Sequence, residues 1–201
     1  MRLLLALRCA PVLLAVVVIA CSPCEEAEPL PELARVPDFE LVSHEGEPFR
    51  GSDLEGEVWI ADFIFTSCVT YCPMMTERMK GLRQELQGEG VRFLSLTVDP
   101  EHDTPEVLRA YAEKHGAAHD DWTFLTGDTA SVSRVVVQGF KTPMGERVPL
   151  DGGDGYDILH ARHFLLVDRR RRIRGYYPSD DEGLERLARD AARLARGEGA
   201  E

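Results

Sequence analysis

Residues 58–73 read VWIADFIFTSCVTYCP, and they join a strand pattern to a helix pattern through two cysteines. The run from Val58 to Phe65 is apolar except for one aspartate and rich in β-branched and aromatic residues, which predicts a buried central strand. A helical spacing begins at Pro73 and continues to about residue 87. The apolar positions of its inward face are Met75, Met79, Leu82 and Leu86. Cys68 and Cys72 therefore stand where a buried strand meets a helix.

The remainder of the chain alternates between strand and helix patterns. After an N-terminal hairpin near Phe39, further strands are expected at residues 91–98, 122–125, 158–167 and 173–177. Helices are expected after Asp103, over residues 129–139 and after Ser179. Strands that alternate with helices predict an α/β fold with a mixed central sheet and helices on both faces.

Composition limits the possible functions. The chain has 201 residues, of which 44% are hydrophobic and 29% charged, so it is one domain or one domain with a tail. Its net charge of −12 makes it a poor candidate for binding nucleic acid. No long uncharged apolar run follows the N-terminus, which excludes a protein that crosses a membrane several times.

The first twenty residues are predicted to be a signal for export. Arg2 and Arg8 precede an apolar run from Pro11 to Ala20, which is short for a membrane span. The run ends at Cys21, and this pattern resembles a bacterial lipoprotein signal in which the cysteine is lipidated after cleavage. An ordinary signal peptide and an uncleaved anchor are the alternatives. We expect an exported protein, tethered by lipid to the membrane on its periplasmic side.

Residues 21–35 are rich in proline and acidic residues, which predicts a solvated linker. Cys24 lies in this linker, and the pattern suggests no role for it. The folded domain is expected to cover residues 36–201.

The two cysteines of the strand–helix junction indicate thiol or metal chemistry. Free N–H groups at a helix start favour a thiolate, and a spacing of four lets Cys68 and Cys72 share a metal or close a disulfide. Two thiolates favour Cu(I), zinc or cluster iron. Structural zinc and iron clusters need more thiol ligands than this chain has near the junction. Copper needs only two or three ligands, so one histidine would complete a site.

Two of the six histidines are candidates for that ligand. The other four are expected to be ordinary turn, loop or helix-end residues: His44, His102, His115 and His119. His160 and His163 lie three residues apart in the predicted strand 158–167, so they would face opposite sides of the sheet. The spacing therefore allows one of them as a ligand and leaves open which.

Three separated segments then resemble the Sco/SenC family. They are residues 62–73, residues 96–112 and the stretch from His160 to Asp168, and the similarity extends roughly from Pro37 to Leu194. The resemblance implies a thioredoxin-like fold with an added N-terminal β-hairpin and an inserted hairpin region before the late histidine. It implies copper, as Cu(I) or Cu(II), bound by two cysteines and one histidine.

The resemblance assigns the ligands to Cys68, Cys72 and His160. His160 is chosen over His163 because the family's ligand histidine precedes an aspartate by eight residues, here Asp168. Asp99 belongs to a family loop segment expected near the site, either to orient ligands or simply to build the loop.

This chain departs from the family pattern in two places. Val69 stands where proline is common after the first cysteine, and residues 169–172 are four arginines in a turn that usually contains glycine. The arginines indicate a solvated turn more than a docking or lipid-headgroup patch.

The implied function is that of a metallochaperone. It would deliver copper to the CuA centre of cytochrome c oxidase subunit II or another copper-accepting envelope protein, or reduce that centre's cysteines, with a thiol reductant protein as a further partner. The alternatives are an envelope thiol–disulfide oxidoreductase using Cys68 and Cys72 without copper, and a copper or redox sensor. Whether the protein is an enzyme therefore stays open.

Overall fold

The computed structural model describes residues 28–69, 71–150 and 155–199. No helix among these residues is long and apolar enough to cross a membrane. The predicted signal peptide, the lipidated Cys21 and Cys24 lie outside the described residues, so they remain predictions.

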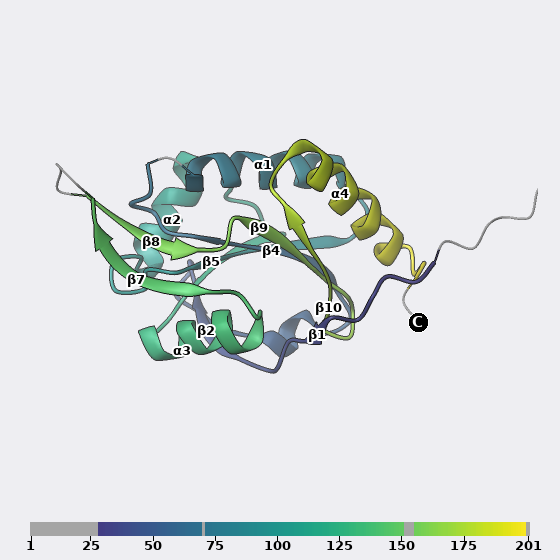
Figure 1. Ribbon diagram of the computed structural model, residues 1–201, viewed down its shortest axis with the longest axis horizontal. Coiled ribbons are helices and arrows are strands. Elements are labelled where there is room, and N and C mark those ends of the chain that lie inside the picture. The colour runs from purple at the N-terminus through teal and green to yellow at the C-terminus, as the bar shows by residue number, and fades with distance from the viewer. Residues whose placement is uncertain (1–27, 70, 151–154, 200–201) are drawn as a thin grey trace, which may run out of the picture.

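A curled sheet of eight strands forms the centre of the molecule (Figure 1). The strands in spatial order are β1 (Ala34–Arg35), β10 (Arg172–Pro178), β9 (His163–Val167), β4 (Val58–Ile64), β5 (Val91–Thr97), β6 (Trp122–Thr126), β2 (Glu40–Ser43) and β3 (Pro48–Arg50). β4 runs parallel to β5 and antiparallel to β9, and β5 runs parallel to β6. The sheet is therefore mixed, and β2 and β3 form the expected N-terminal hairpin.

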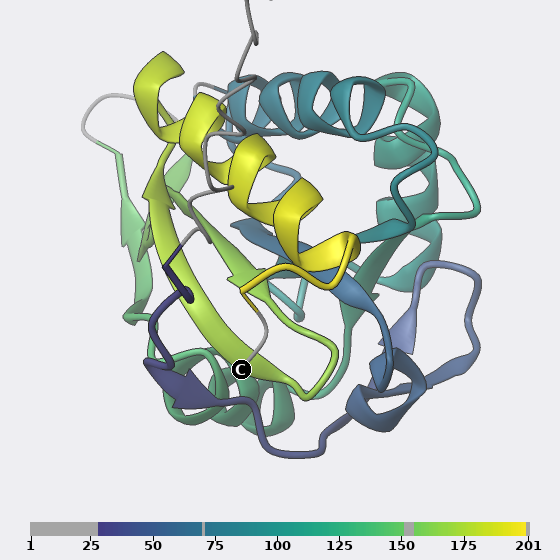
Figure 2. The same ribbon diagram turned by 90° about the vertical axis from the view of Figure 1, so that its right-hand side faces the viewer.

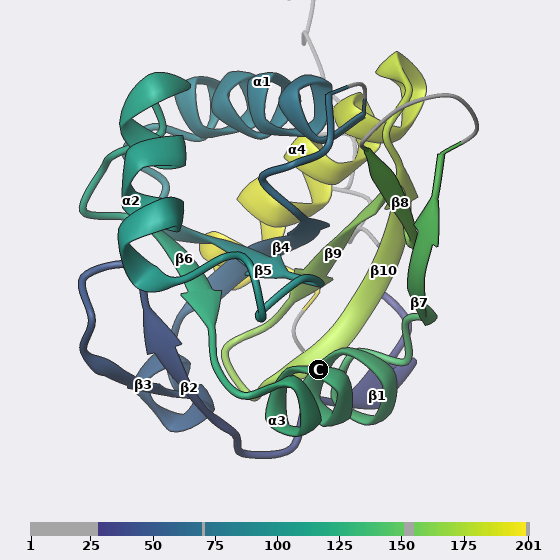
Figure 3. The ribbon, with the colours of Figure 1, turned by 90° about the vertical axis from the view of Figure 1, so that its left-hand side faces the viewer.

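Helices cover both faces of this sheet. α1 (Tyr71–Glu85) and α4 (Asp181–Ala195) lie side by side over one face, whereas α3 (Thr129–Ser133) and the π-helical turn Arg134–Gly139 lie on the other (Figures 2 and 3). α2 (Pro105–Lys114) begins where Thr104 accepts a hydrogen bond from Val107 N and Pro105 fills the first turn. The predicted α/β architecture is confirmed.

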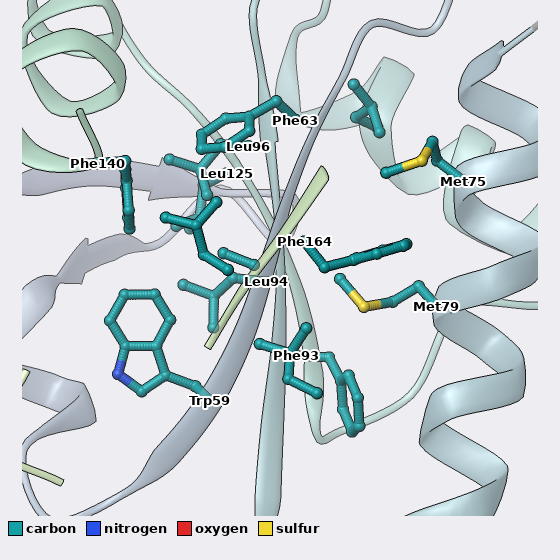
Figure 4. Close-up of a cluster of buried hydrophobic side chains, with 14 of the residues drawn as sticks. Trp59, Phe63, Met75, Met79, Phe93, Leu94, Leu96, Leu125, Phe140 and Phe164 are labelled. Carbon is teal, nitrogen blue, oxygen red and sulfur yellow. The ribbon is translucent and has the colours of Figure 1, made fainter. Parts of the chain in front are cut away.

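The core holds β4 rigidly from both sides. Every residue of β4 is buried, as its continuous apolar pattern predicts. Figure 4 shows Met75 and Met79 of α1 on one side of the sheet, and Trp59 and Phe140 on the other. The ring of Phe140 packs edge-on against Trp59, with centroids 5.8 Å apart. A strand packed this closely provides a fixed base for the cysteine loop that follows it.

The prediction of a single strand over residues 158–167 is wrong, because the strand is interrupted after His160. β8 (Tyr156–His160) pairs with β7 (Met144–Pro149) in a separate two-stranded sheet, and β9 starts at His163. Burial alternates along β8, which has one exposed face, but is continuous in β9 after its first residue. The change from alternating to continuous burial marks the step from a hairpin edge to the central sheet. The β7–β8 hairpin is the inserted hairpin that the family resemblance implies.

The residues before β2 are attached to the domain. β1 pairs with β10, and the buried Arg174 guanidinium donates a 3.0 Å hydrogen bond to Pro31 O and another to Leu30 O. Residues 28–35, part of the predicted linker, therefore contact the folded domain.

The arginine turn after β9 is built on Asp168. Its carboxylate accepts hydrogen bonds from the backbone N–H groups of Arg170 and Arg172, both at 2.9 Å. Arg171 adopts the left-handed conformation, with φ of 60°, that glycine usually takes in such turns. Its guanidinium pairs with Asp38 at 3.1 Å, and Arg172 pairs with Glu32 at 3.2 Å. Internal ion pairs thus use two of the four charges, consistent with a structural turn.

Candidate metal centre

Cys68 and Cys72 lie in the loop and first turn that connect β4 to α1. Both are thiols that are not joined by a disulfide, and both side chains are buried. Cys72 N donates a hydrogen bond to Cys68 Sγ at 3.4 Å, and Phe65 N donates one to Cys72 Sγ at 3.4 Å. A backbone N–H of the first turn of α1 therefore points at Cys68 Sγ, as expected for a helix start, whereas the N–H that points at Cys72 Sγ comes from the residue after β4.

The protonation of Cys72 differs from the expectation of a better thiolate. The adjacent Cys68 side chain, through a hydrogen bond, and burial raise the pKa of Cys72 well above its ordinary value. The N–H group of Phe65 acts in the opposite direction but is outweighed. A buried thiol beside a second sulfur keeps its proton, so a metal ion must displace that proton to bind.

His160, the last residue of β8, comes to the same place from the other end of the chain. Its Nε2 lies 3.9 Å from Cys72 Sγ. Its Nδ1 lies 2.6 Å from the carbonyl oxygen of Ile158, and because that oxygen only accepts, Nδ1 must carry the proton. Nε2 then has a free lone pair directed at the sulfur. This is the tautomer and orientation that a metal-ligating histidine needs.

His163 lies elsewhere. Its ring packs edge-on against Phe63 and Tyr176, with centroids 6.4 and 5.2 Å away. Its Nε2 is buried and has no hydrogen-bond partner among the described residues, and burial lowers its pKa. The structure therefore brings His160, rather than His163, to the two thiols.

Phe65 connects the parts of this centre. Its ring packs edge-on against His160 at 5.5 Å and stacks on Tyr156 at 6.0 Å. Its backbone N–H binds Cys72, as described above. From the sequence, Phe65 was predicted only as the end of the buried strand, because an aromatic residue at a strand end gives no sign of a contact with a distant hairpin.

Asp103 supports the start of the cysteine loop. Its buried carboxylate accepts hydrogen bonds from Thr66 N at 3.1 Å, Thr66 Oγ1 at 2.5 Å and Thr97 Oγ1 at 2.6 Å. His102 lies 3.0 Å from the same carboxylate and is half exposed. From the sequence, Asp103 was predicted only to stand at the opening of a helix. Its position shortly after β5, the strand next to β4, was the one sign of a contact with the cysteine loop.

Asp99 faces the hairpin. Its carboxylate accepts hydrogen bonds from Arg147 of β7 and Tyr156 of β8. Its expected place in a loop near the centre is therefore observed, and its partners are residues that no sequence motif singled out.

Exposed apolar side chains border the centre on the outside. Val69 follows Cys68 and is 84% exposed, and Leu159 precedes His160 and is 71% exposed. The Arg162 guanidinium lies 3.6 Å from the centre of the Tyr71 ring, which connects the two segments that contain the candidate ligands. The thiols and the imidazole thus lie just beneath a surface made by these segments.

A comparison with models of protein families shows to which family this chain belongs. The model of the family described as SCO1/SenC matches residues 28–196. The chain belongs to the SCO1/SenC family. Its fold is accordingly the thioredoxin-like fold of that family, with an inserted hairpin.

Relatives of this SCO1/SenC chain are similar to it in sequence or in fold over most of their length. It is 36% identical to the SCO1 protein homolog of Bacillus subtilis over 151 residues, 74% of this chain and 75% of the relative. BsSco is described as a member of the Sco family of cytochrome c oxidase assembly proteins in which a disulfide switch was identified. Its structure matches this chain with a TM-score of 0.69 and 31% sequence identity, covering 84% of this chain and 96% of that chain. Bradyrhizobium japonicum ScoI with copper bound shares the fold, with a TM-score of 0.69 and 24% identity over 80% and 99% of the two chains.

Proposed function

We propose that this SCO1/SenC chain is a copper-binding metallochaperone of cytochrome c oxidase assembly. The observation that carries the proposal is the position of His160 Nε2, which lies 3.9 Å from Cys72 Sγ, next to the second thiol of Cys68. Copper, taken up as Cu(I) or Cu(II), would be held by Cys68, Cys72 and His160.

The chemistry of the three donors supports copper as the cargo. Two sulfurs and one imidazole form a soft set that suits Cu(I), whereas structural zinc is bound by four ligands. The remaining cysteines of the chain, Cys9, Cys21 and Cys24, all precede the family match. A donor set of three leaves an open coordination position.

Each residue has a separate part in uptake and release. Cys68 and Cys72 lose their protons as the ion binds, and the carbonyl of Ile158 keeps the imidazole in the binding tautomer. An acceptor's cysteines and histidines then replace these ligands one at a time. We propose the CuA centre of cytochrome c oxidase subunit II as the acceptor, because the related BsSco is a member of a family of assembly proteins for that oxidase.

Attachment to a membrane would place the centre near a membrane-bound acceptor. The proposed anchor is lipid on Cys21 after removal of residues 1–20, which would hold the domain on the periplasmic side. A tether of this kind raises the effective concentration of the protein at the acceptor.

A second function is favoured by the closeness of the two thiols. In thiol–disulfide exchange, Cys68 and Cys72 would form a disulfide and pass two electrons and two protons to a partner's disulfide. A thiol reductant protein would then restore the dithiol. This reaction needs neither the tautomer nor the position of His160, and for that reason we rank it below copper delivery. A sensor of copper or redox state would use the same centre without transfer.

The decisive experiment follows transfer to an acceptor. The reduced full-length chain in detergent, with Cys24→Ser to remove an extra thiol, is loaded with one Cu(I) and mixed with the reduced, copper-free soluble domain of subunit II. Chaperone function predicts that copper moves to the acceptor. Reduction of an oxidised acceptor by the copper-free chain, without copper transfer, would favour the oxidoreductase. Copper binding with neither result would favour the sensor.

The two late histidines give a direct test of the ligand set. We expect His160→Ala to weaken Cu(I) binding by roughly 10- to 100-fold, because one of three ligands is lost. Mutating residues that only orient metal ligands already lowers metal affinity by about this factor. The matched control His163→Ala should leave the affinity unchanged, since that ring packs against Phe63 and Tyr176. Competition with a chromophoric Cu(I) chelator measures both. Equal losses in the two variants would contradict the assignment.

A further inference from the structure

The hairpin that contains His160 is not part of the central sheet. Within residues 28–69, 71–150 and 155–199, β7 and β8 pair only with each other. In Figure 3 the two strands lie along the side of the domain, next to β9 and β10. A two-stranded hairpin is at best marginally stable in water, so side-chain contacts must hold it against the domain.

The inward face of the hairpin combines the candidate ligand with two polar residues. Along β8, Ile158 and His160 are buried and Tyr156 is half-buried, whereas Asp157 and Leu159 are exposed. Alternate residues of a strand share a face, so Tyr156 points to the same side as His160. Arg147 lies directly opposite Ile158 in the register of the hairpin and shares that side.

Arg147 and Tyr156 meet on a single buried carboxylate of the central domain. Asp99, only 2% exposed, accepts hydrogen bonds from Arg147 Nε at 2.8 Å, from Arg147 Nη2 and from the Tyr156 hydroxyl. Arg147 Nη1 also donates to Glu101 at 3.0 Å, and its guanidinium lies 5.2 Å from the centre of the Tyr156 ring. We call Asp99, Arg147 and Tyr156 the hairpin clip.

The domain side of the clip is fixed by the backbone. Asp99 N donates to Thr97 Oγ1 at 2.9 Å, and the carbonyl of Asp99 accepts from His102 N and Asp103 N. A buried carboxylate is costly unless it is paired and hydrogen-bonded, and here the hairpin supplies both kinds of contact. The pKa of Tyr156 is raised by burial and by its hydrogen bond to Asp99.

The clip also touches the cysteine loop. Tyr156 Oη lies 3.2 Å from the hydroxyl oxygen of Ser67, the residue before Cys68. The Tyr156 ring stacks on Phe65, whose own ring packs against His160. Tyr156 thus connects the hairpin, the loop after β5 and the cysteine loop, and it lies four residues before His160 in β8.

We propose that Arg147 and Tyr156 are positioning residues, which hold the hairpin to Asp99 so that His160 Nε2 faces Cys72. They act through His160 and do not touch the cargo. The copper readout of this inference depends on the proposed function, whereas the position of the hairpin and the tautomer of His160 can be measured without copper.

The test uses Tyr156→Phe, which removes the hydroxyl and keeps the ring on Phe65. The matched control is Tyr177→Phe, because the Tyr177 hydroxyl donates to Asp190 of α4 at 2.8 Å, away from the hairpin. In the reduced, copper-free full chain, we expect amide hydrogen exchange across β8 to speed up about tenfold in Tyr156→Phe and to stay unchanged in the control. Nitrogen-15 shifts of the His160 ring should show the Nδ1–H tautomer weakened only in Tyr156→Phe.

Copper affinity separates positioning from a general effect. Tyr156→Phe should weaken Cu(I) binding about tenfold, a typical size for a residue that orients a ligand. In a His160→Ala background it should weaken binding no further, because its effect passes through His160. An equal loss in both backgrounds would overturn the proposal, and so would unchanged exchange and ring shifts. If the parent chain binds no Cu(I), the proposed function fails, while the exchange and ring shifts still decide whether the clip positions His160.

Discussion

Replacing Cys72 with serine is expected to weaken Cu(I) binding by about a hundredfold. A serine hydroxyl is a hard donor that stays protonated at neutral pH, so it does not replace a thiolate toward Cu(I). Structural zinc in zinc-finger peptides contributes about 10–16 kcal/mol over four ligands, which gives roughly 3 kcal/mol, or about a hundredfold, for one ligand. Cys72 is fully buried, and its Sγ lies 3.9 Å from His160 Nε2.

The measurement is a competition titration of the reduced chain against a chromophoric Cu(I) chelator. Cys24→Ser, in the predicted linker, is the matched control, and it should leave one tightly bound Cu(I) per chain. Thermal unfolding of the copper-free variants separates loss of a ligand from loss of the fold. An affinity equal to that of the parent chain would remove Cys72 from the proposed ligand set and with it the copper function.

The substitution Asp62→Asn is expected to stabilise the protein at pH 8 by as much as about 4 kcal/mol. Burial raises the pKa of Asp62 from 3.8 to about 7, despite a 2.6 Å hydrogen bond from the Ser95 hydroxyl. Its second oxygen, Oδ2, is buried and has no hydrogen-bond partner among the described residues. A charge at this place is costly, and a neutral amide of the same shape avoids that cost.

The dependence on pH gives the sign of the effect. The unfolded chain ionises Asp62 near pH 3.8, whereas the folded chain keeps the proton up to about pH 7. The stability that the protonated carboxyl contributes is therefore complete below about pH 4 and is lost as the pH rises to about 7 and above. A pKa raised from 3.8 to about 7 corresponds to roughly 4 kcal/mol.

Unfolding in urea at pH 4, 6 and 8 tests this expectation. The gain in the free energy of unfolding for Asp62→Asn should grow with pH. In a separate thermal unfolding measurement at pH 8, the melting temperature should rise by up to about 16 °C. Glu85→Gln, at an exposed position of α1, is the control and should show no such trend. A gain that is the same at all three pH values would show that charge burial at Asp62 is not the cause.

Local patterns in the sequence were sufficient for the central elements. The continuous apolar run of residues 58–65 predicted a strand buried on both faces, and the spacing of Met75, Met79 and Leu82 predicted the buried side of α1. These predictions succeeded because burial of a strand on both faces leaves a continuous apolar run, and burial of one side of a helix leaves a regular period. Both signals are visible in a short window of sequence. The positions of Cys68 and Cys72 at the junction followed from the same two patterns.

Tertiary structure decided how the third donor reaches the thiols. The family resemblance selected His160 by its spacing from Asp168, but the strand pattern alone left His160 and His163 as equal candidates. The interruption between β8 and β9 is what gives the two rings different surroundings. The protonation of Cys72 was likewise decided by contacts, since the adjacent Cys68 side chain and burial raise its pKa by more than the hydrogen bond from Phe65 N–H lowers it.

The contrast between residues 58–73 and the hairpin clip separates what the sequence alone determined from what the tertiary structure decided. Residues 58–73 determined a buried strand, a helix and two cysteines between them, because each of these depends on neighbours a few positions away. In the clip, Arg147 lies 48 residues and Tyr156 lies 57 residues after Asp99 in the sequence. Their meeting depends on how the β7–β8 hairpin folds back on the central sheet. Hydrogen bonds between such distant residues leave no local period, so only the tertiary structure decided where His160 points.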